Sequence, residues 1–158
     1  NNNADGGCGT PTRGVFHAKE PNNAGMLYTV NMASTGNLIE FGNTFNTGAN
    51  NVLSGCSNAV RGIWGGAYNS DSLIYADLTS FGNAFDFGDM TSARYEVGMA
   101  SSPTRACMLA GAAVPGYTMK NDIEYVQIMT TGNAVDFGDL NFSGYYVGGL
   151  SNGHGGLG

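Results

Sequence analysis

Two short stretches of the sequence carry side-chain oxygens at a spacing that could hold a metal ion. Each stretch has one Asn and two Asp at intervals of three residues, and the six residues are Asn83, Asp86, Asp89, Asn133, Asp136 and Asp139. Oxygen ligands gathered in one turn are those that calcium prefers. Asn and Asp beside Gly also stabilise turns by bonding their own backbone, and the related stretch near residue 40 has Glu40 and Asn43 instead. We therefore expect turn residues here, with a calcium site as the alternative and no other cofactor.

Aromatic residues offer a second kind of chemistry, because their rings have apolar faces and polar edges on which sugars stack. Tyr68 and Tyr117 fall in stretches between expected strands, where binding residues concentrate. They are the candidates for ligand contact. Trp64 and Tyr75 lie inside strand-like runs, and we expect them in the core.

Three arginines, Arg13, Arg61 and Arg105, begin similar runs of residues. Three guanidinium groups at equivalent positions could form a ring of positive charge that binds an anion. Alternatively, each could donate to carbonyls of a neighbouring segment or to an Asp of the adjacent turn. We expect the second role, because five N–H donors suit a structural lock.

Nucleophilic catalysis finds little support in the sequence. His17 and His154 are the only histidines, and neither stands near a Cys or Ser arrangement with a supporting acid. Asp86-Phe87-Gly88 spells a kinase magnesium motif, but no phosphate loop accompanies it. We expect that the protein is not an enzyme.

The cysteines, Cys8, Cys56 and Cys107, are odd in number and widely spaced. This pattern fits neither a paired disulfide framework nor a zinc ribbon. We expect inert thiols without a disulfide.

The elements that must position these residues are short strands in a repeat. An anchor of eight residues recurs at 36–43, 82–89 and 132–139, which gives offsets of 46 and 50 residues. Strand-like runs precede the anchors at 26–32, 73–78 and 123–129, and others follow the second and third at 94–99 and 144–149. Each period therefore holds about four short strands, and we expect one all-β repeat domain over residues 1–158.

An isolated four-stranded unit cannot bury both of its faces. We expect the anchor phenylalanines, with two neighbouring apolar residues, to fill the core between adjacent units; these residues are Phe41, Phe87, Phe137, Phe85 and Val135.

The third copy carries a resemblance to a known family. Met90 to Arg94, then Gly98-Met99-Ala100, Arg105 and the run from Met108 to Gly111, is similar to the kelch repeat. The stretch from Ile123 to Leu140 also resembles Gly-rich kelch-like repeats in large virion and fibre proteins of marine tailed phages. The resemblance implies a β-propeller of four-stranded blades, and an extracellular or virion location.

About three blades are expected, in permuted order. The chain is expected to open near a second strand, at Arg13 to Ala18, and to close after a first strand, at Tyr145 to Ser151. Three blades are too few to close a propeller. We therefore expect self-association, in which terminal strands of different copies complete a blade. Two chains would give a six-bladed ring, and a contact that does not close would give a filament.

Composition limits the partners. The formal net charge is −6 and the few basic residues are scattered, so we expect no nucleic-acid binding through phosphates. No run approaches the roughly 18 apolar residues that span a bilayer, and no membrane partner is expected. Without an initiator Met, the sequence suggests a processed product or a fragment.

The function expected from the sequence is a structural or binding module of a phage appendage, such as a tail fibre or adhesin. Other virion proteins or a host-surface glycan would be its partners. The alternatives are a soluble lectin-like module and a secreted protein that polymerises into filaments.

Overall fold

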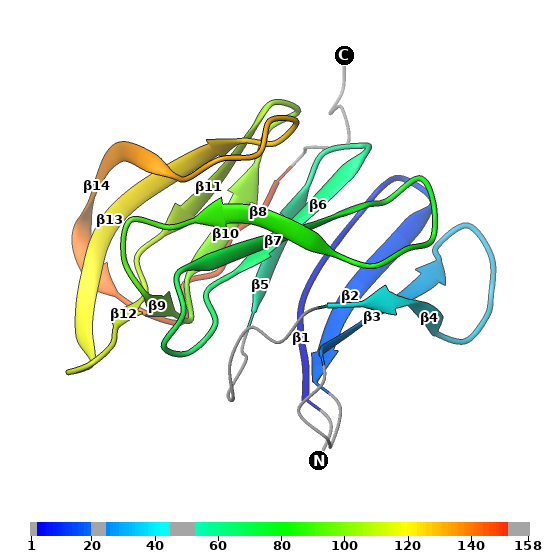
Figure 1. The fold of residues 1–158 in the computed structure, drawn as a ribbon, viewed down its shortest axis with the longest axis horizontal. Coiled ribbons are helices and arrows are strands. Elements are labelled where there is room, and N and C mark those ends of the chain that lie inside the picture. The colour runs from blue at the N-terminus through cyan, green and yellow to red at the C-terminus, as the bar shows by residue number, and fades with distance from the viewer. Residues whose placement is uncertain (1–2, 20–24, 45–52, 152–158) are drawn as a thin grey trace.

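The computed structural model describes residues 3–19, 25–44 and 53–151, with side chains from Gly6 onward. These residues form fourteen strands and no helix (Figure 1). The prediction of an all-β chain built of four-stranded antiparallel sheets is confirmed. Short apolar runs separated by Gly, Asn and Ser explain the result, because such runs fit a pleated surface and such residues fit turns. The described ranges contain no helix that could span a membrane.

Three sheets follow one another along the chain, and the first two have sequential strand order. The first sheet contains β1 (Asn3–Gly9), β2 (Arg13–Lys19), β3 (Gly25–Asn31) and β4 (Ile39–Asn43). The second contains β5 (Ser54–Ser57), β6 (Arg61–Gly65), β7 (Ser72–Asp77) and β8 (Phe85–Asp89). The third contains β10 (Gly98–Ser101), β11 (Arg105–Leu109), β13 (Thr118–Gln127) and β14 (Val135–Gly144). Two short strands, β9 (Arg94–Tyr95) and β12 (Ala112–Ala113), extend the third sheet beside β13. The third sheet, of six strands, thus has the order β10-β11-β13-β12-β9 with β14 paired to β13.

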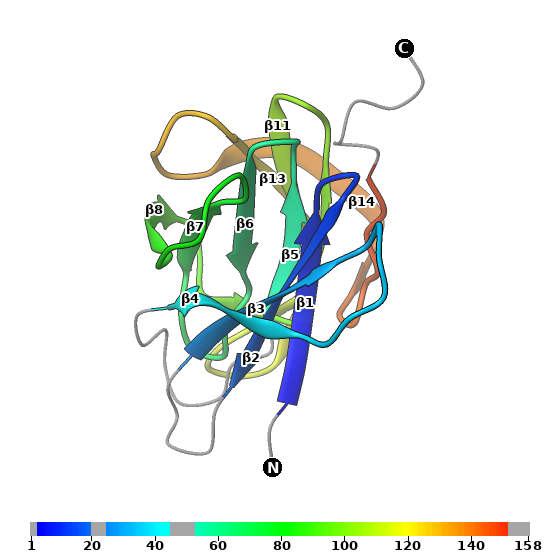
Figure 2. The ribbon, with the colours of Figure 1, turned by 90° about the vertical axis from the view of Figure 1, so that its right-hand side faces the viewer.

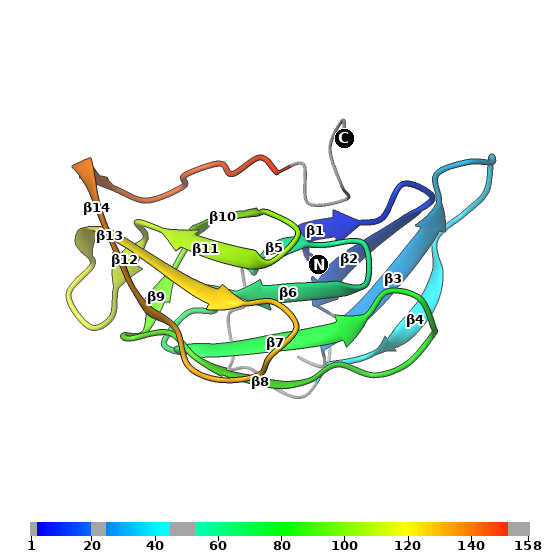
Figure 3. The same ribbon diagram turned by 90° about the horizontal axis from the view of Figure 1, so that it is seen from above.

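The sheets stand side by side with their faces in contact, and the second lies between the other two (Figure 1). The first strand of each sheet lies on the same side of the molecule, where β5 runs between β1 and β10 (Figure 3). The outer strands β4 and β8 lie on the opposite side, and β14 starts there and curves round the third sheet towards the side of β10 (Figure 3). The three sheets are therefore successive copies of one unit, stacked through their faces.

The expectation that the chain opens at a second strand is wrong. β1 precedes it and pairs with β2 from Gly9↔Gly14 to Asn3↔Lys19. The sequence hides this strand because its many glycines leave no alternation of polar and apolar side chains to read. As a result, each described sheet has its own four strands, and none needs a strand from another copy.

The expected strands at 94–99 and 144–149 are interrupted. Glu96 and Tyr146, which are 50 residues apart, both have a φ of 56°. A positive φ interrupts the extended backbone of a strand. β9 therefore ends before Glu96, and β14 ends before Tyr146. Residues 145–151 contain no strand, contrary to expectation.

The anchors are strands rather than the turns expected for their Asp-Phe-Gly-Asp sequence. They supply β4, β8 and the first half of β14. A bulge accompanies the anchor glycines, since Gly88 and Gly138 have φ angles of 141° and 142° beside shifts of register. Gly without a Cβ adopts this conformation at low cost, which explains its place in an outer strand.

A buried ion pair in the third unit was not anticipated from the sequence. Arg94 has no exposed surface, and its Nη2 lies 2.5 Å from Oε1 of the buried Glu124. Arg94 Nη1 also donates to the carbonyl of Ala110 at 2.9 Å, and the Thr91 amide donates to Glu124 Oε2 at 3.0 Å. The pair thus ties the loop before β9 to β13.

Removal of one partner should destabilise the fold strongly. We expect Glu124→Ala to lower the free energy of unfolding by ~3 to 5 kcal/mol, because the buried Arg94 charge loses its close partner and keeps only the Asp122 carboxylate, 3.7 Å away. The double variant Arg94→Met/Glu124→Leu should recover most of this loss. Urea denaturation measures both. A single variant as stable as the parent would show that the pair is not buried as described.

Candidate functional site

The contact between the first and second sheets is an apolar core. The first sheet contributes Val15, Leu27 and Phe41, and the second contributes Trp64, Ile74 and Leu78. The expectation of Trp64 as a core residue is confirmed, and Tyr75 is half-buried against the next core. The second sheet therefore packs against the first sheet with the side chains of one face and against the third sheet with those of the other face.

One group of hydrogen bonds between the sheets comes from the loop before each outer strand. Gly82 N–H donates to Phe41 O at 3.1 Å, and Ala84 N–H donates to Asn43 O at 2.9 Å. The Asn83 side-chain oxygen accepts the Asn43 amide at 2.9 Å. Three bonds thus join the Gly-Asn-Ala loop of the second unit to β4 of the first.

The contact between the second and third sheets repeats these bonds at equivalent residues. Gly132 N–H donates to Phe87 O at 2.8 Å, and Ala134 N–H donates to Asp89 O at 2.7 Å. The Asn133 side-chain oxygen accepts the Asp89 amide at 3.1 Å. The two interfaces between sheets are therefore equivalent, with hydrogen bonds between the same positions of the repeat.

Two of the three repeat arginines reach across these interfaces. Arg13 Nη1 donates to Leu78 O at 2.6 Å, and Arg61 Nη1 donates to Ile128 O at 3.0 Å. These two guanidinium groups act between sheets, as a structural lock would. Arg105 is exposed and lies over the Tyr125 ring at 4.8 Å.

The outward face of the third sheet is uncovered. Phe41 and Phe87 are 4% and 2% exposed, but Phe137 at the same place in the third anchor is 53% exposed. The expectation that Phe85 and Val135 fill the core is wrong, because both are exposed on outer strands. The phenylalanine of the third unit has the interface role of its counterparts only if another sheet covers it.

The outward face of the first sheet is also uncovered (Figure 2). Met32 is 55% exposed, whereas Leu78 and Ile128 at the equivalent positions are 1% and 0% exposed. Leu38 and Phe16 on this unit are exposed as well. The stack thus ends in apolar surface on both sides.

The candidate calcium ligands are divided between a loop and a strand. Asn83 and Asn133 accept backbone amides of the preceding unit, as described above. Asp86 and Asp136 are exposed on outer strands. In the described residues no group of three or more His, Cys, Asp or Glu side chains is placed to hold a metal ion.

The two candidate ligand-binding tyrosines, Tyr68 and Tyr117, are brought together although they are distant in sequence. Their hydroxyls lie 3.3 Å apart, and this hydrogen bond raises the pKa of Tyr68 above its ordinary value. Tyr95 completes a tyrosine cluster, with ring centroids 5.3 Å from Tyr68 and 5.9 Å from Tyr117. Sequence reasoning missed Tyr95 because it lies in a strand-like run.

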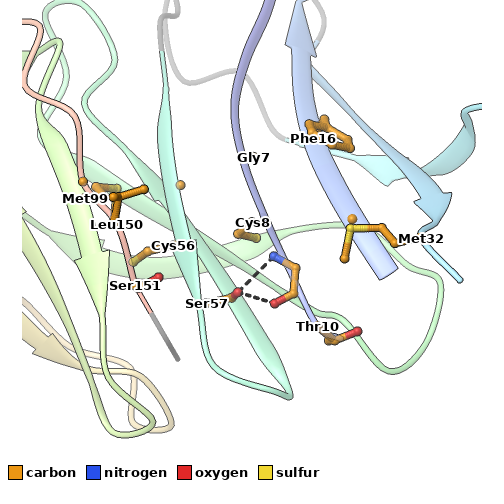
Figure 4. Close-up of a pocket in the computed structure, with 14 residues that line it drawn as sticks. Gly7, Cys8, Thr10, Phe16, Met32, Cys56, Ser57, Met99, Leu150 and Ser151 are labelled. Carbon is orange, nitrogen blue, oxygen red and sulfur yellow. Dashed lines mark hydrogen bonds between the residues drawn. The ribbon is translucent and has the colours of Figure 1, made fainter. Parts of the chain in front are cut away.

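A concavity of about 490 Å³ runs along the first strands of the sheets (Figure 4). Its lining includes Cys8, Cys56, Met99 and Leu150, and Ser57 Oγ bonds both the amide and the carbonyl of Gly9 there. The lining is mostly glycine, sulfur and apolar side chains. It offers shape but few groups for polar recognition.

The thiols are poor nucleophiles. All three cysteines are free. Burial raises the pKa of Cys56 to about 12 and that of Cys8 well above its ordinary value, so both are protonated at neutral pH. His17 is buried, and His154 lies outside the described residues.

Comparison with known proteins adds no family: neither a protein-family model nor a curated protein matches this sequence.

Because Phe87 is buried and Phe137 is exposed, replacing each with Ala should have different effects on the free energy of unfolding. We expect Phe87→Ala to lower the free energy of unfolding by ~3 to 5 kcal/mol, because it empties a packed interface. Phe137→Ala removes the same ring from an exposed surface and should change the free energy of unfolding by about 0.5 kcal/mol or less. Urea denaturation of both variants at low protein concentration makes the comparison, and equal losses would contradict the assignment of the uncovered face.

Proposed function

We propose that the chain is a structural or binding protein, and that its three units are consecutive blades of a kelch-like β-propeller. The observation that supports this most is the repeated interface, in which a Gly-Asn-Ala loop bonds the preceding outer strand twice with the same partners. A contact that repeats with fixed geometry turns each unit by the same step. Such a step produces a ring when it closes and a filament when it does not.

The proposed role is assembly, in an extracellular or virion appendage such as a tail fibre or adhesin. The exposed apolar residues at the two ends of the stack support a role that depends on further blades. Large exposed apolar surface marks an interaction site in a soluble protein. The virion setting comes from the resemblance of the repeat to Gly-rich phage repeats.

Glycan recognition is a second candidate function, and the tyrosine cluster favours it. Three rings, two from loops and one from β9, present aromatic faces and hydroxyl groups together, and Tyr117 among them is 61% exposed. Aromatic faces and hydroxyls suit the C–H faces and hydroxyl groups of a sugar. The cluster would then be the contact surface of the appendage, while the ends of the stack serve assembly.

Assembly can be tested with a matched pair of phenylalanines. We expect the parent chain to associate as its concentration rises, and Phe137→Ser to abolish this association. Phe85→Ser, at the edge of the contact between the second and third sheets, which is already covered and where its ring meets Tyr75, should retain it. Analytical ultracentrifugation gives the mass, and negative-stain images distinguish rings from filaments. A parent chain that stays a compact monomer at high concentration would refute the proposed assembly.

Glycan binding can be tested on an array of host-type oligosaccharides. Tyr117→Ala should weaken binding of any captured glycan about tenfold, since it removes the most exposed stacking face. Tyr117→Phe should retain most of the affinity, and Phe142→Ala, a change of another exposed aromatic, should retain all of it. Equal losses for Tyr117→Ala and Phe142→Ala, or no bound glycan, would reject the cluster as a sugar site.

A further inference from the structure

The segment that follows β14 repeats the backbone that leads into β10. Residues 94–98 read Arg-Tyr-Glu-Val-Gly and residues 144–148 read Gly-Tyr-Tyr-Val-Gly. The third residue of each, Glu96 or Tyr146, has the same φ of 56°. The first segment delivers the chain from the end of the second unit to the first strand of the third. The second segment therefore delivers it to the start of another unit.

The first strands of successive units touch at one fixed pair of positions. Gly6 N–H of β1 donates to Leu53 O at 2.5 Å, just before β5. One unit later, Ser54 Oγ of β5 donates to Val97 O at 2.5 Å, just before β10. Gly6 and Ser54 are equivalent, as are Leu53 and Val97, because β1, β5 and β10 pair with their second strands in the same register.

The same pair of positions meets a third time beyond β10. Gly98 is equivalent to Gly6, and a Cβ on it would lie only 2.8 Å from Val147 O, where Val147 is equivalent to Leu53. A Cβ on Gly149 would likewise collide with the backbone of Met99. Residues 147–151 therefore lie against β10 as β10 lies against β5, along the side of the molecule where the first strands gather (Figure 3).

The rest of the third sheet's outward face carries the groups that bind the next unit elsewhere in the stack. In the second unit, Phe87 O, Asp89 O and the Asp89 amide form hydrogen bonds with the Gly-Asn-Ala loop of the third unit. The equivalent groups of the third unit are Phe137 O, Asp139 O and the Asp139 amide. Arg105 occupies the place of Arg13 and Arg61, which donate to the carbonyl just after the third strand of the following unit. In the described residues no loop and no third strand reaches them.

We propose that a fourth unit of the same repeat covers this face, and that residues 144–151 are its beginning. This inference rests on the proposed stacking of blades and names the partner of the uncovered face. The fourth unit would present a Gly-Asn-small-residue loop to Phe137 and Asp139, and the carbonyl just after its third strand to Arg105.

A second copy of the chain fits this face less well than a fourth unit that continues from β14. Its β1 would have to take the position against Gly98 and Met99 that residues 147–151 already hold. A continuing unit has no such conflict, because residues 147–151 themselves hold the place of its first strand.

The test extends the full chain by its own repeat. Residues 109–146 are added after Gly158, which keeps the 50-residue offset so that Gly158 takes the place of Met108. Hydroxyl-radical footprinting then follows oxidation of Phe137. We expect it to fall at least fivefold, to the rate of Phe87, at every protein concentration, and the added residues to resist protease. A matched extension in which the added copy of Asn133 is changed to Ala should protect Phe137 less.

An added unit that is digested by protease and leaves Phe137 as reactive as in the parent would overturn the inference. Protection of Phe137 in the extended chain that appears only as its concentration rises would assign the face to a second copy and would also overturn it. A folded extension that protects Phe137 but never forms rings or filaments would leave the inference intact and reject the assembly role.

Discussion

Each sheet in this protein has two apolar faces, and a sheet can bury a face only against another sheet. The second sheet satisfies this requirement fully, with one core on each side. The first and third sheets satisfy it on one side only, which leaves apolar residues such as Met32 and Phe137 in solvent. Burial of apolar surface is the main driving force of folding and association, so the ends of the stack are the surfaces at which we propose that this molecule meets others.

The close approach of backbones explains the unusual composition. Sheets that bond through loop and strand backbone leave no space for a Cβ at positions such as Gly88, where it would lie 2.5 Å from Gly132 O. Glycine is therefore needed where units meet, and few charges are needed because backbone groups and single arginines join the sheets. Gly6, Gly42 and Gly98 also approach the backbone of a neighbouring unit, so this mode of packing accounts for part of the glycine content.

Much of the fold could be predicted from the sequence because the repeat is strong. Fixed offsets between anchors predict equal units, and the positions of Phe41 and Phe87 predict the cores between them. The strand β1 could not be predicted, because glycines carry no alternating pattern. The Arg94–Glu124 pair could not be predicted either, since both residues depart from their counterparts in the other units.

The candidate site was harder to predict than the fold. Loop positions singled out Tyr68 and Tyr117, but only the packing of a loop of the second unit against the third unit brings them to Tyr95. The Asn residues that suggested a metal site serve the sheet interface, because the amide they accept belongs to the preceding unit. Spacing along one chain segment does not reveal a partner that comes from another segment.

Amide hydrogen exchange tests the repeated interface most directly. The Asn43 and Asp89 amides donate to side-chain oxygens of the following unit, and the Asp139 amide has no following unit in the described residues. In dilute protein, NMR should find slow exchange at Asn43 and Asp89, and exchange at least tenfold faster at Asp139. Equal rates at all three amides would contradict the account, because they would mean that the sheets do not bond one another in the way described.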